Sequence, residues 1–250
     1  MNNSKDVGES GKRFGKGIYL LPHLFTTAGL FAGFYAIVAA MKGLFGVASV
    51  AIFIAMLADA LDGRVARLTG TQSAFGAEYD SLSDMVAFGI APALVAYTWG
   101  LHNLGKLGWL AAFLYAAATA LRLARFNVHV DDADTDKRYF KGLPCPAAAG
   151  FIAGMIWLQY IFLLRGGIVD ISIGILMVIV AILMISNVHY RSFKDIDLKG
   201  SVPFINVLII LLFFVGIALD PPYVLFAIFA LYLVSGPFGA LSRRCKKDKD

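Results

Sequence analysis

Charged side chains are scarce in this sequence, since Asp, Glu, Lys and Arg together make up only 16% of the 250 residues. A soluble domain typically carries about 25% charged residues, so this composition argues against a water-soluble fold. Hydrophobic residues reach 59%, and the mean hydropathy is +0.73. These values are typical of a polytopic membrane protein built as one bundle of spanning helices.

Cysteine is also scarce, and the N-terminal segment lacks the features of a signal peptide. The two cysteines, Cys145 and Cys245, lie too far apart in sequence to suggest a metal-binding pair or a disulfide framework. Residues 1–17 are mostly polar, and no short apolar core with a small-residue cleavage site follows them. We therefore expect a cytoplasmic tail with a short interfacial end.

Apolar runs long enough to cross a bilayer recur along the rest of the chain. A span needs roughly 20 apolar residues, and polar or turn-rich separators divide the chain into eight such runs. The sequence therefore predicts an all-α polytopic membrane helix bundle with about eight transmembrane helices. Its single transmembrane domain covers residues 18–241, and residues 242–250 form a basic cytoplasmic tail. The predicted spans are 20–41, 44–66, 80–100, 106–127, 147–165, 170–189, 202–219 and 222–241.

The distribution of Lys and Arg predicts the orientation of these spans. With the N-terminus inside, 19 of the 22 basic residues fall on the inner side of the membrane, as the positive-inside rule expects. The net charge of +5 thus follows membrane topology and does not indicate a nucleic-acid partner. We predict a multi-pass protein of the cell inner (cytoplasmic) membrane with both termini in the cytoplasm.

Four aspartates interrupt the apolar sequence near the end of the second predicted span and at the start of the third. Asp59 and Asp62 are three residues apart, and Asp80 and Asp84 are four apart, so each pair lies on one face of a helix. Two such helices facing each other would gather four carboxylates, which would repel one another without cations. Carboxylate oxygens suit Mg²⁺ or Mn²⁺, and a pair of such ions is the usual arrangement for phosphoryl transfer.

The residues around these acids fit a ligand that carries phosphate. Gly63 and Ala66 have small side chains, so a ligand can approach the helix backbone there. The planar guanidinium of Arg67 can donate several hydrogen bonds to a phosphate. Gly76 lies in a short polar break, LTGTQSAFG, that can turn the chain between the two helices. Simple pairing of the acids with Arg64 and Arg67 is the alternative, but two arginines cannot neutralise four carboxylates.

These residues form the pattern D-x2-D-G-x2-A-R-x8-G-x3-D-x3-D. The pattern resembles the signature of the CDP-alcohol phosphotransferases, with every fixed position present. The resemblance implies an integral membrane enzyme that transfers a phosphatidyl or related group from a CDP-linked donor to an alcohol. It also implies two metal ions on Asp59, Asp62 and Asp80, with Asp84 completing the metal site and acting as general base. By the same resemblance, the residues that line the nucleotide are Gly63, Ala66, Arg67 and Gly76.

Three further segments, SDMVAFGIAPA, ALRLARFN and GLPCPAAAG, resemble the bacterial membrane-integral phosphatidylserine synthases within this superfamily. The chain is predicted to have two spans more than the family's usual six, which is a further similarity to these synthases. The resemblance implies CDP-diacylglycerol as donor, L-serine as acceptor, membrane lipid as surroundings and a homodimer. Arg122, Arg125 and Lys141 are candidates to hold a donor phosphate or the serine carboxylate. Anchoring to lipid headgroups is an equal alternative for the two arginines.

Other readings of the sequence remain open. A sister enzyme could use glycerol 3-phosphate or an inositol phosphate as acceptor, with the same three cations binding its phosphate. A cation transporter could use the carboxylates as an ion path, although all four acids gather near one membrane face. His23 stands where the family often has Asn. It either lies near the nucleotide site or is simply an interfacial histidine.

Overall fold

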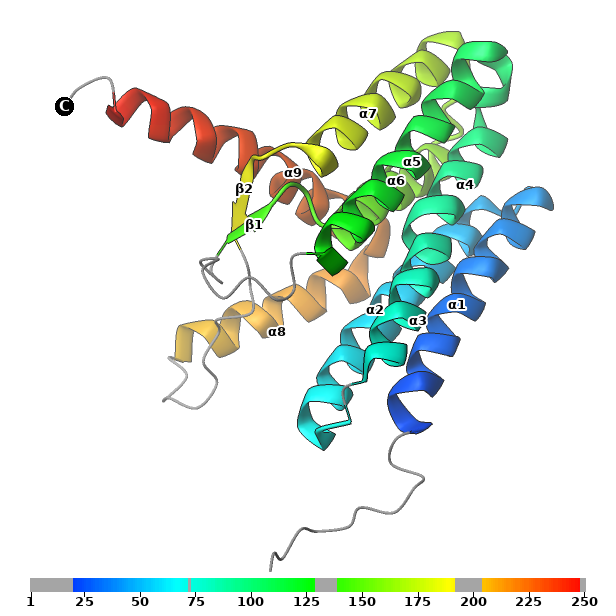
Figure 1. Cartoon of the computed structure of the whole chain (residues 1–250). Helices are drawn as coiled ribbons and strands as arrows, with labels where there is room; N and C mark the ends of the chain where they lie inside the picture. Colours follow the sequence, from blue (N-terminus) through cyan, green and yellow to red (C-terminus); the bar gives the residue numbers. More distant parts are fainter. Residues whose placement is uncertain (1–19, 72, 129–138, 192–203, 248–250) are drawn as a thin grey trace, which may run out of the picture.

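The computed structural model describes residues 20–71, 73–128, 139–191 and 204–247, which form a bundle of helices with one short two-stranded ribbon (Figure 1). The predicted N-terminal tail, residues 1–17, lies outside the described residues. The helices are α1 (Leu20–Met41), α2 (Phe45–Thr69), α3 (Ala74–Asp84), α4 (Ala91–Trp99), α5 (Lys106–Val128), α6 (Cys145–Ile161), α7 (Gly167–Ile185), α8 (Phe204–Leu219) and α9 (Pro221–Lys247). A π-helical turn, η2 (Met85–Ile90), joins α3 to α4, and a 3₁₀ turn, η3 (Leu101–Leu104), follows α4.

The prediction of an all-α membrane bundle is confirmed. Each of the eight predicted spans corresponds to a helix among the described residues, the third being the continuous run from α3 through η2 to α4. Within the described part of the chain, six helices are long and apolar enough to cross a membrane. Helices α6 and α8 are apolar but shorter, with 17 and 16 residues. Helix α9 continues to Lys247, beyond the predicted end of the last span at residue 241.

The corner between α2 and α3 is tighter than the sequence suggests. The sequence predicts a polar break that begins at LTGTQSAFG, residues 68–76, and a third span from residue 80, whereas α2 runs to Thr69 and α3 already begins at Ala74. Gly70 ends α2 in the left-handed conformation (φ 63°), and the Ser73 hydroxyl caps α3 by accepting from the Gly76 amide at 3.0 Å. Gly76 is therefore part of the first turn of α3 rather than of the break, and Asp80 lies well inside a helix.

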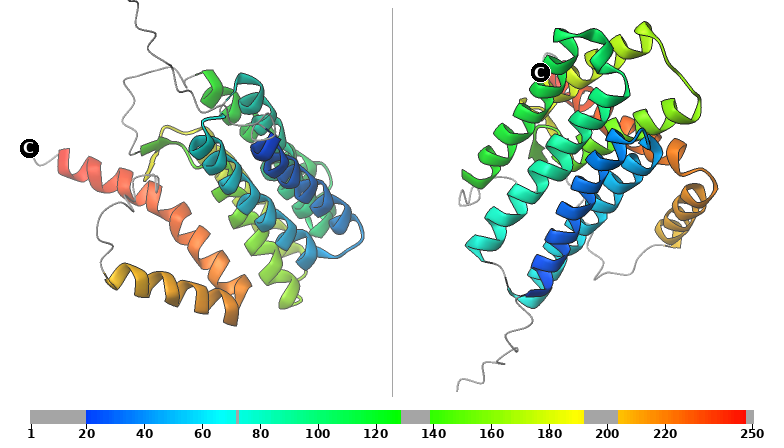
Figure 2. Two further views of the ribbon diagram at one scale, coloured as in Figure 1. Left: turned by 90° about the horizontal axis from the view of Figure 1, so that it is seen from below. Right: turned by 90° about the vertical axis from the view of Figure 1, so that its right-hand side faces the viewer.

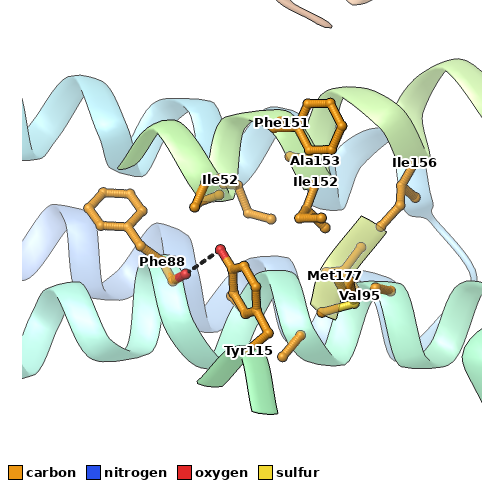
Figure 3. Close-up of a cluster of buried hydrophobic side chains, with 14 of the residues drawn as sticks. Ile52, Phe88, Val95, Tyr115, Phe151, Ile152, Ala153, Ile156 and Met177 are labelled. Carbon is orange, nitrogen blue, oxygen red and sulfur yellow. Dashed lines mark hydrogen bonds between the residues drawn. The ribbon is translucent and has the colours of Figure 1, made fainter. Parts of the chain in front are cut away.

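The π-helical turn follows directly after Asp84, and a proline lies just beyond it. Pro92 has no amide hydrogen, so the carbonyl of Phe88, four residues earlier, loses its helical partner. The buried Tyr115 hydroxyl of α5 donates to this carbonyl at 2.9 Å (Figure 3). Gly33 of α1 packs against the same turn, where an added Cβ would lie 2.6 Å from the Cα of Ala87. The third span is thus irregular next to its aspartates, as π turns at functional sites often are.

This hydrogen bond gives a first prediction about stability. Tyr115→Phe should lower the free energy of unfolding by about 1–3 kcal/mol, because the Phe88 carbonyl would remain buried without a donor. Unfolding of the purified protein in detergent, followed by circular dichroism, measures the loss. Tyr35→Phe is the control, since that side chain is 45% exposed. Equal stability of the two variants would contradict the role given to Tyr115.

A small antiparallel ribbon, which is not predicted from the sequence, joins two loops at one end of the bundle. Strand β1 (Tyr139–Lys141) pairs with β2 (His189–Arg191), with Phe140 opposite Tyr190. The ribbon follows α5 and α7 in sequence and contacts α9. Helix α8 stands apart from the main bundle, with its main contacts on α9 (Figure 2). The C-terminal helix therefore connects the ribbon, α6 and α8.

Candidate active site

The four aspartates meet in one pocket between α1, α2 and α3. Asp59 and Asp62 come from the second half of α2, and Asp80 and Asp84 come from α3. Carboxylate oxygens of Asp59, Asp62 and Asp80 lie within 4.8 Å of one another. Asp84 lines the same pocket, together with Thr26, Gly29 and Ser83 among others. The i, i+3 and i, i+4 spacings therefore bring the predicted metal ligands together across two helices.

Helix α1 holds this cluster through two hydroxyl groups. The Thr26 hydroxyl donates to Oδ2 of Asp62 at 2.9 Å, and Asp62 is only 4% exposed. The Ser83 hydroxyl donates to the backbone carbonyl of Thr26 at 3.0 Å. Neither hydroxyl residue is predicted as part of the site from the sequence. In the sequence, Thr26 is only a polar residue within an apolar span, and Ser83 is only a serine directly before Asp84. Neither pattern is specific enough to assign the residue to the site without the fold.

The carboxylates fit a divalent cation by the chemistry of their donor set. All ligand atoms are hard oxygens, as Mg²⁺ and Mn²⁺ prefer. Oδ1 of Asp80 is buried and has no hydrogen-bond partner among the described residues. A buried carboxylate oxygen without a partner is costly, so a cation at this position would satisfy it.

The residues predicted to line the nucleotide lie beyond the aspartates, toward the α2–α3 corner. Gly63 and Ala66 follow Asp62 along α2, and Nε of Arg67 donates to the Gly63 carbonyl at 2.7 Å. Gly76 lies against the His23 ring, where an added Cβ would be 3.1 Å from Cε1 of His23. These residues do not line the aspartate pocket itself. They occupy the adjoining surface between α1, α2 and α3.

His23 is part of an aromatic cluster at the start of α1. Its ring contacts Phe75 and Tyr79 edge to face, with centroids 5.8 and 6.3 Å away. Phe75 and Tyr79 stack on each other, and the Tyr79 hydroxyl is 2.9 Å from that of Thr27. This cluster joins α1 to the first turns of α3. His23 therefore lies against Gly76, beside the aspartate pocket and not in its lining.

The three candidate cations for the acceptor gather around the ribbon. Nη1 of Arg122 donates to the carbonyls of Lys141 and Met184, at 3.0 and 3.2 Å. Nη2 of Arg125 donates to the Asn187 side chain at 2.9 Å. Lys141 itself is exposed at the end of β1. The two arginines therefore connect the end of α5 to the end of α7.

Cys145 links this basic group to the aspartates. It is the first residue of α6, and its buried thiol lies close enough to interact electrostatically with both Arg122 and Asp84. The Arg122 guanidinium of α5 and the Asp84 carboxylate of α3 therefore both lie within electrostatic range of this thiol.

The bundle and its pocket define the class of protein, an integral membrane protein with a carboxylate site suited to divalent cations. The particular family follows from comparison with known proteins. The CDP-alcohol phosphatidyltransferase family matches residues 19–188, and the chain belongs to this family. The resemblance seen in the aspartate signature is thereby confirmed.

Relatives with assigned names match most of the chain. The "CDP-diacylglycerol--serine O-phosphatidyltransferase" of Helicobacter pylori is 36% identical over 222 residues, which cover 88% of this chain and 90% of the relative. A protein of that name from Mycobacterium leprae is 31% identical over 91% of this chain and 76% of its own length. The "Archaetidylserine synthase" of Methanothermobacter thermautotrophicus is 34% identical over 68% of this chain and 69% of its own length. The match to each relative extends well beyond the aspartate signature.

Proposed function

We propose that the protein transfers the phosphatidyl group of CDP-diacylglycerol to L-serine and releases CMP. The observation that carries this proposal is the likeness to serine phosphatidyltransferases over nearly nine-tenths of the chain. The convergence of the signature aspartates in one pocket supports it independently. The serine hydroxyl would form the new bond to the lipid-side phosphorus, the bond to the CMP oxygen would break, and CMP would leave.

Divalent cations fit the aspartate pocket in this reaction. Asp59, Asp62 and Asp80 would hold Mg²⁺ or Mn²⁺, as a pair of ions with Asp84 completing the site. Bound there, the ions would supply Lewis-acid neutralisation of the pyrophosphate charge. Thr26 fixes the orientation of Asp62 through its hydrogen bond, so the ligand oxygens are positioned before the donor binds.

The remaining residues of the site would bind and orient the substrates. Asp84 would accept the proton of the serine hydroxyl as that oxygen attacks, which is the role of a general base. The residues lining the surface toward the α2–α3 corner would contact the nucleotide. These are Gly63, Ala66, Arg67 and Gly76.

Arg122 is the best placed of the three cations to bind the serine carboxylate. Its Nη1 is held by two backbone carbonyls, so the guanidinium is fixed in orientation. The guanidinium also contacts the Cys145 thiol, and its remaining donors would bind a carboxylate at little further cost in side-chain entropy. The electrostatic interaction of Cys145 with Asp84 supports this assignment. Arg125 and Lys141 are the alternatives for the carboxylate or for the donor phosphate.

Substitution of the three cations should distinguish these assignments. A charged hydrogen bond contributes about 1.5–3 kcal/mol, so Arg122→Lys should raise the KM for serine by roughly one to two orders of magnitude. The KM for CDP-diacylglycerol should stay within about twofold, because a residue that binds only the acceptor leaves donor binding unchanged. Arg125→Ala and Lys141→Ala, measured against both substrates, complete the set. Arg165→Lys is the control, since Arg165 stacks on Trp99 at the far end of α4. A change confined to the donor KM would assign Arg122 to the donor phosphate.

We further propose that the aspartate end of the bundle faces the cytoplasm from the inner membrane, where CDP-linked lipids and serine would be available. The excess of Lys and Arg at this end supports that orientation. Cysteines introduced in a Cys245→Ser background, where the remaining Cys145 is buried, test it with a membrane-impermeant maleimide. Lys42→Cys and Lys106→Cys should be labelled in intact cells, whereas Ala77→Cys should need permeabilised cells. Labelling of Ala77→Cys from outside would overturn the orientation.

The acceptor itself is tested with purified protein, CDP-diacylglycerol and a panel of alcohols. We expect CMP and phosphatidylserine with L-serine, and little product with glycerol 3-phosphate or an inositol phosphate. Phosphatidylglycerol phosphate without phosphatidylserine would overturn the acceptor assignment while leaving the aspartate chemistry intact.

A homodimer, proposed here on the family resemblance alone, is tested by the mass of the detergent-solubilised protein.

A further inference from the structure

A second proline in the bundle creates the same need for a donor that Phe88 has next to the aspartates. Pro237 lies inside α9, so the carbonyl of Leu233, four residues earlier, has no helical amide to accept from. The hydroxyl of Tyr190 donates to that carbonyl at 3.2 Å. Tyr190 belongs to β2, so this hydrogen bond connects the ribbon to the C-terminal helix.

The Tyr190 side chain is fixed on α9 by packing as well. It is 1% exposed, and its ring lies 5.5 Å from that of Tyr232. Gly236 makes room for the ring, because a Cβ at this position would overlap it. Burial raises the pKa of the Tyr190 phenol to about 12, so the hydroxyl stays protonated and remains a donor at neutral pH. Ring and hydroxyl together hold β2 against one site on α9.

The ribbon connects the Tyr190 contact on α9 to Arg122. Tyr190 pairs with Phe140 in the register that also sets His189 opposite Lys141. The Gly142 amide, just after β1, donates to the Val188 carbonyl just before β2, at 2.7 Å. The Lys141 carbonyl is one of the two that accept from Nη1 of Arg122. The position of the guanidinium therefore depends on the ribbon, and that of the ribbon on α9.

We infer that Tyr190 is a positioning residue for the acceptor, which acts through the ribbon to hold Arg122 at the site. This inference rests on the function proposed above. It gives α9 a role in the reaction although the helix lies outside residues 19–188, the part of the chain that matches the family. Tyr190 itself contacts no substrate in this scheme. The C-terminal helix is then part of the machinery for acceptor use, not only of the membrane anchor.

Two substitutions on opposite sides of the contact test the inference. Tyr190→Phe removes the donor and keeps the ring, and Gly236→Ala keeps the tyrosine but displaces its ring. Each should raise the KM for serine about fivefold to tenfold, as expected when one hydrogen-bonded contact is lost, with kcat and the KM for CDP-diacylglycerol within twofold. Gly216→Ala on α8 is the matched control, because its Cβ would meet Val224 at an ordinary 3.5 Å. The double variant Tyr190→Leu/Gly236→Ala should be no worse than Tyr190→Leu alone, since both changes remove the same contact.

Hydrogen exchange provides a readout that does not depend on the acceptor. The amides of Gly142 and Leu143, bonded to the carbonyls of Val188 and Leu183, should exchange faster in Tyr190→Phe and Gly236→Ala than in the wild type or Gly216→Ala. Faster exchange with no change in the KM for serine would overturn the positioning role. An equal rise in the KM for serine and in the KM for CDP-diacylglycerol would show that Tyr190 has only a structural role. A wild-type protein that does not use serine would instead refute the proposed function, whatever the exchange rates.

Discussion

Replacing Asp84 by Asn is expected to lower kcat for CMP release by about 10²–10⁴-fold, because the amide cannot accept the proton of the acceptor hydroxyl. The carboxylate belongs to the last residue of α3 and lines the same pocket as the other three acids. Asn has nearly the same volume, so the bundle should remain folded. Initial rates of CMP formation at saturating concentrations of both substrates measure the effect.

The same variant should be at least as stable as the wild type when metal ions are chelated. Asp84 lies close enough to Asp59, Asp62 and Asp80 to interact with their charges, and removing one of four like charges relieves repulsion. Asp220→Asn, at the exposed turn between α8 and α9, is the matched control and should change neither rate nor stability. Wild-type kcat in Asp84→Asn would remove this residue from the proposed chemistry.

Chelation is expected to abolish turnover, and added Mg²⁺ or Mn²⁺ should restore it. The reason is the pocket itself, in which three carboxylates lie within 4.8 Å and one buried oxygen of Asp80 has no partner among the described residues. An ion at 100 times its dissociation constant should also raise the free energy of unfolding by about 2.7 kcal/mol. Thermal unfolding in detergent across a Mg²⁺ titration measures this gain separately from activity.

Two variants make the metal experiment specific. Asp80→Asn should shift the Mg²⁺ dependence of both activity and stability to higher concentration, since it removes a charged ligand. Asp220→Asn should leave both titrations unchanged. Full activity in a thoroughly chelated sample would exclude the metal-dependent mechanism.

The sequence was most informative where function depends on short-range spacing. Asp59 with Asp62, and Asp80 with Asp84, share a helical face by arithmetic alone, so their meeting in one pocket could be predicted. The apolar runs gave the helices for a similar reason, because a bilayer requires long uninterrupted spans. The corner was less predictable, since the Ser73 cap decides where α3 begins and small polar residues are common throughout that break.

Long-range contacts were beyond the reach of these patterns. The link from Thr26 to Asp62 spans 36 residues, and that from Tyr190 to Leu233 spans 43. The three-residue strands of the ribbon carry no periodicity that could reveal them. The sequence identifies Arg122 as a candidate substrate-binding residue. Its hydrogen bonds to two backbone carbonyls are seen only in the fold, which brings α5, β1 and α7 together.

The short corner between α2 and α3 has a consequence for how the protein is made and how its relatives can diverge. All four acids lie on one hairpin of neighbouring helices, so the aspartate pocket is complete once the third span has entered the membrane. In the proposed function, the acceptor would instead be bound by a residue of α5 and positioned by the ribbon and α9, which are synthesised later and brought together from distant parts of the chain. On that proposal, relatives would keep the aspartate hairpin unchanged and acquire a new acceptor through changes in the later segments.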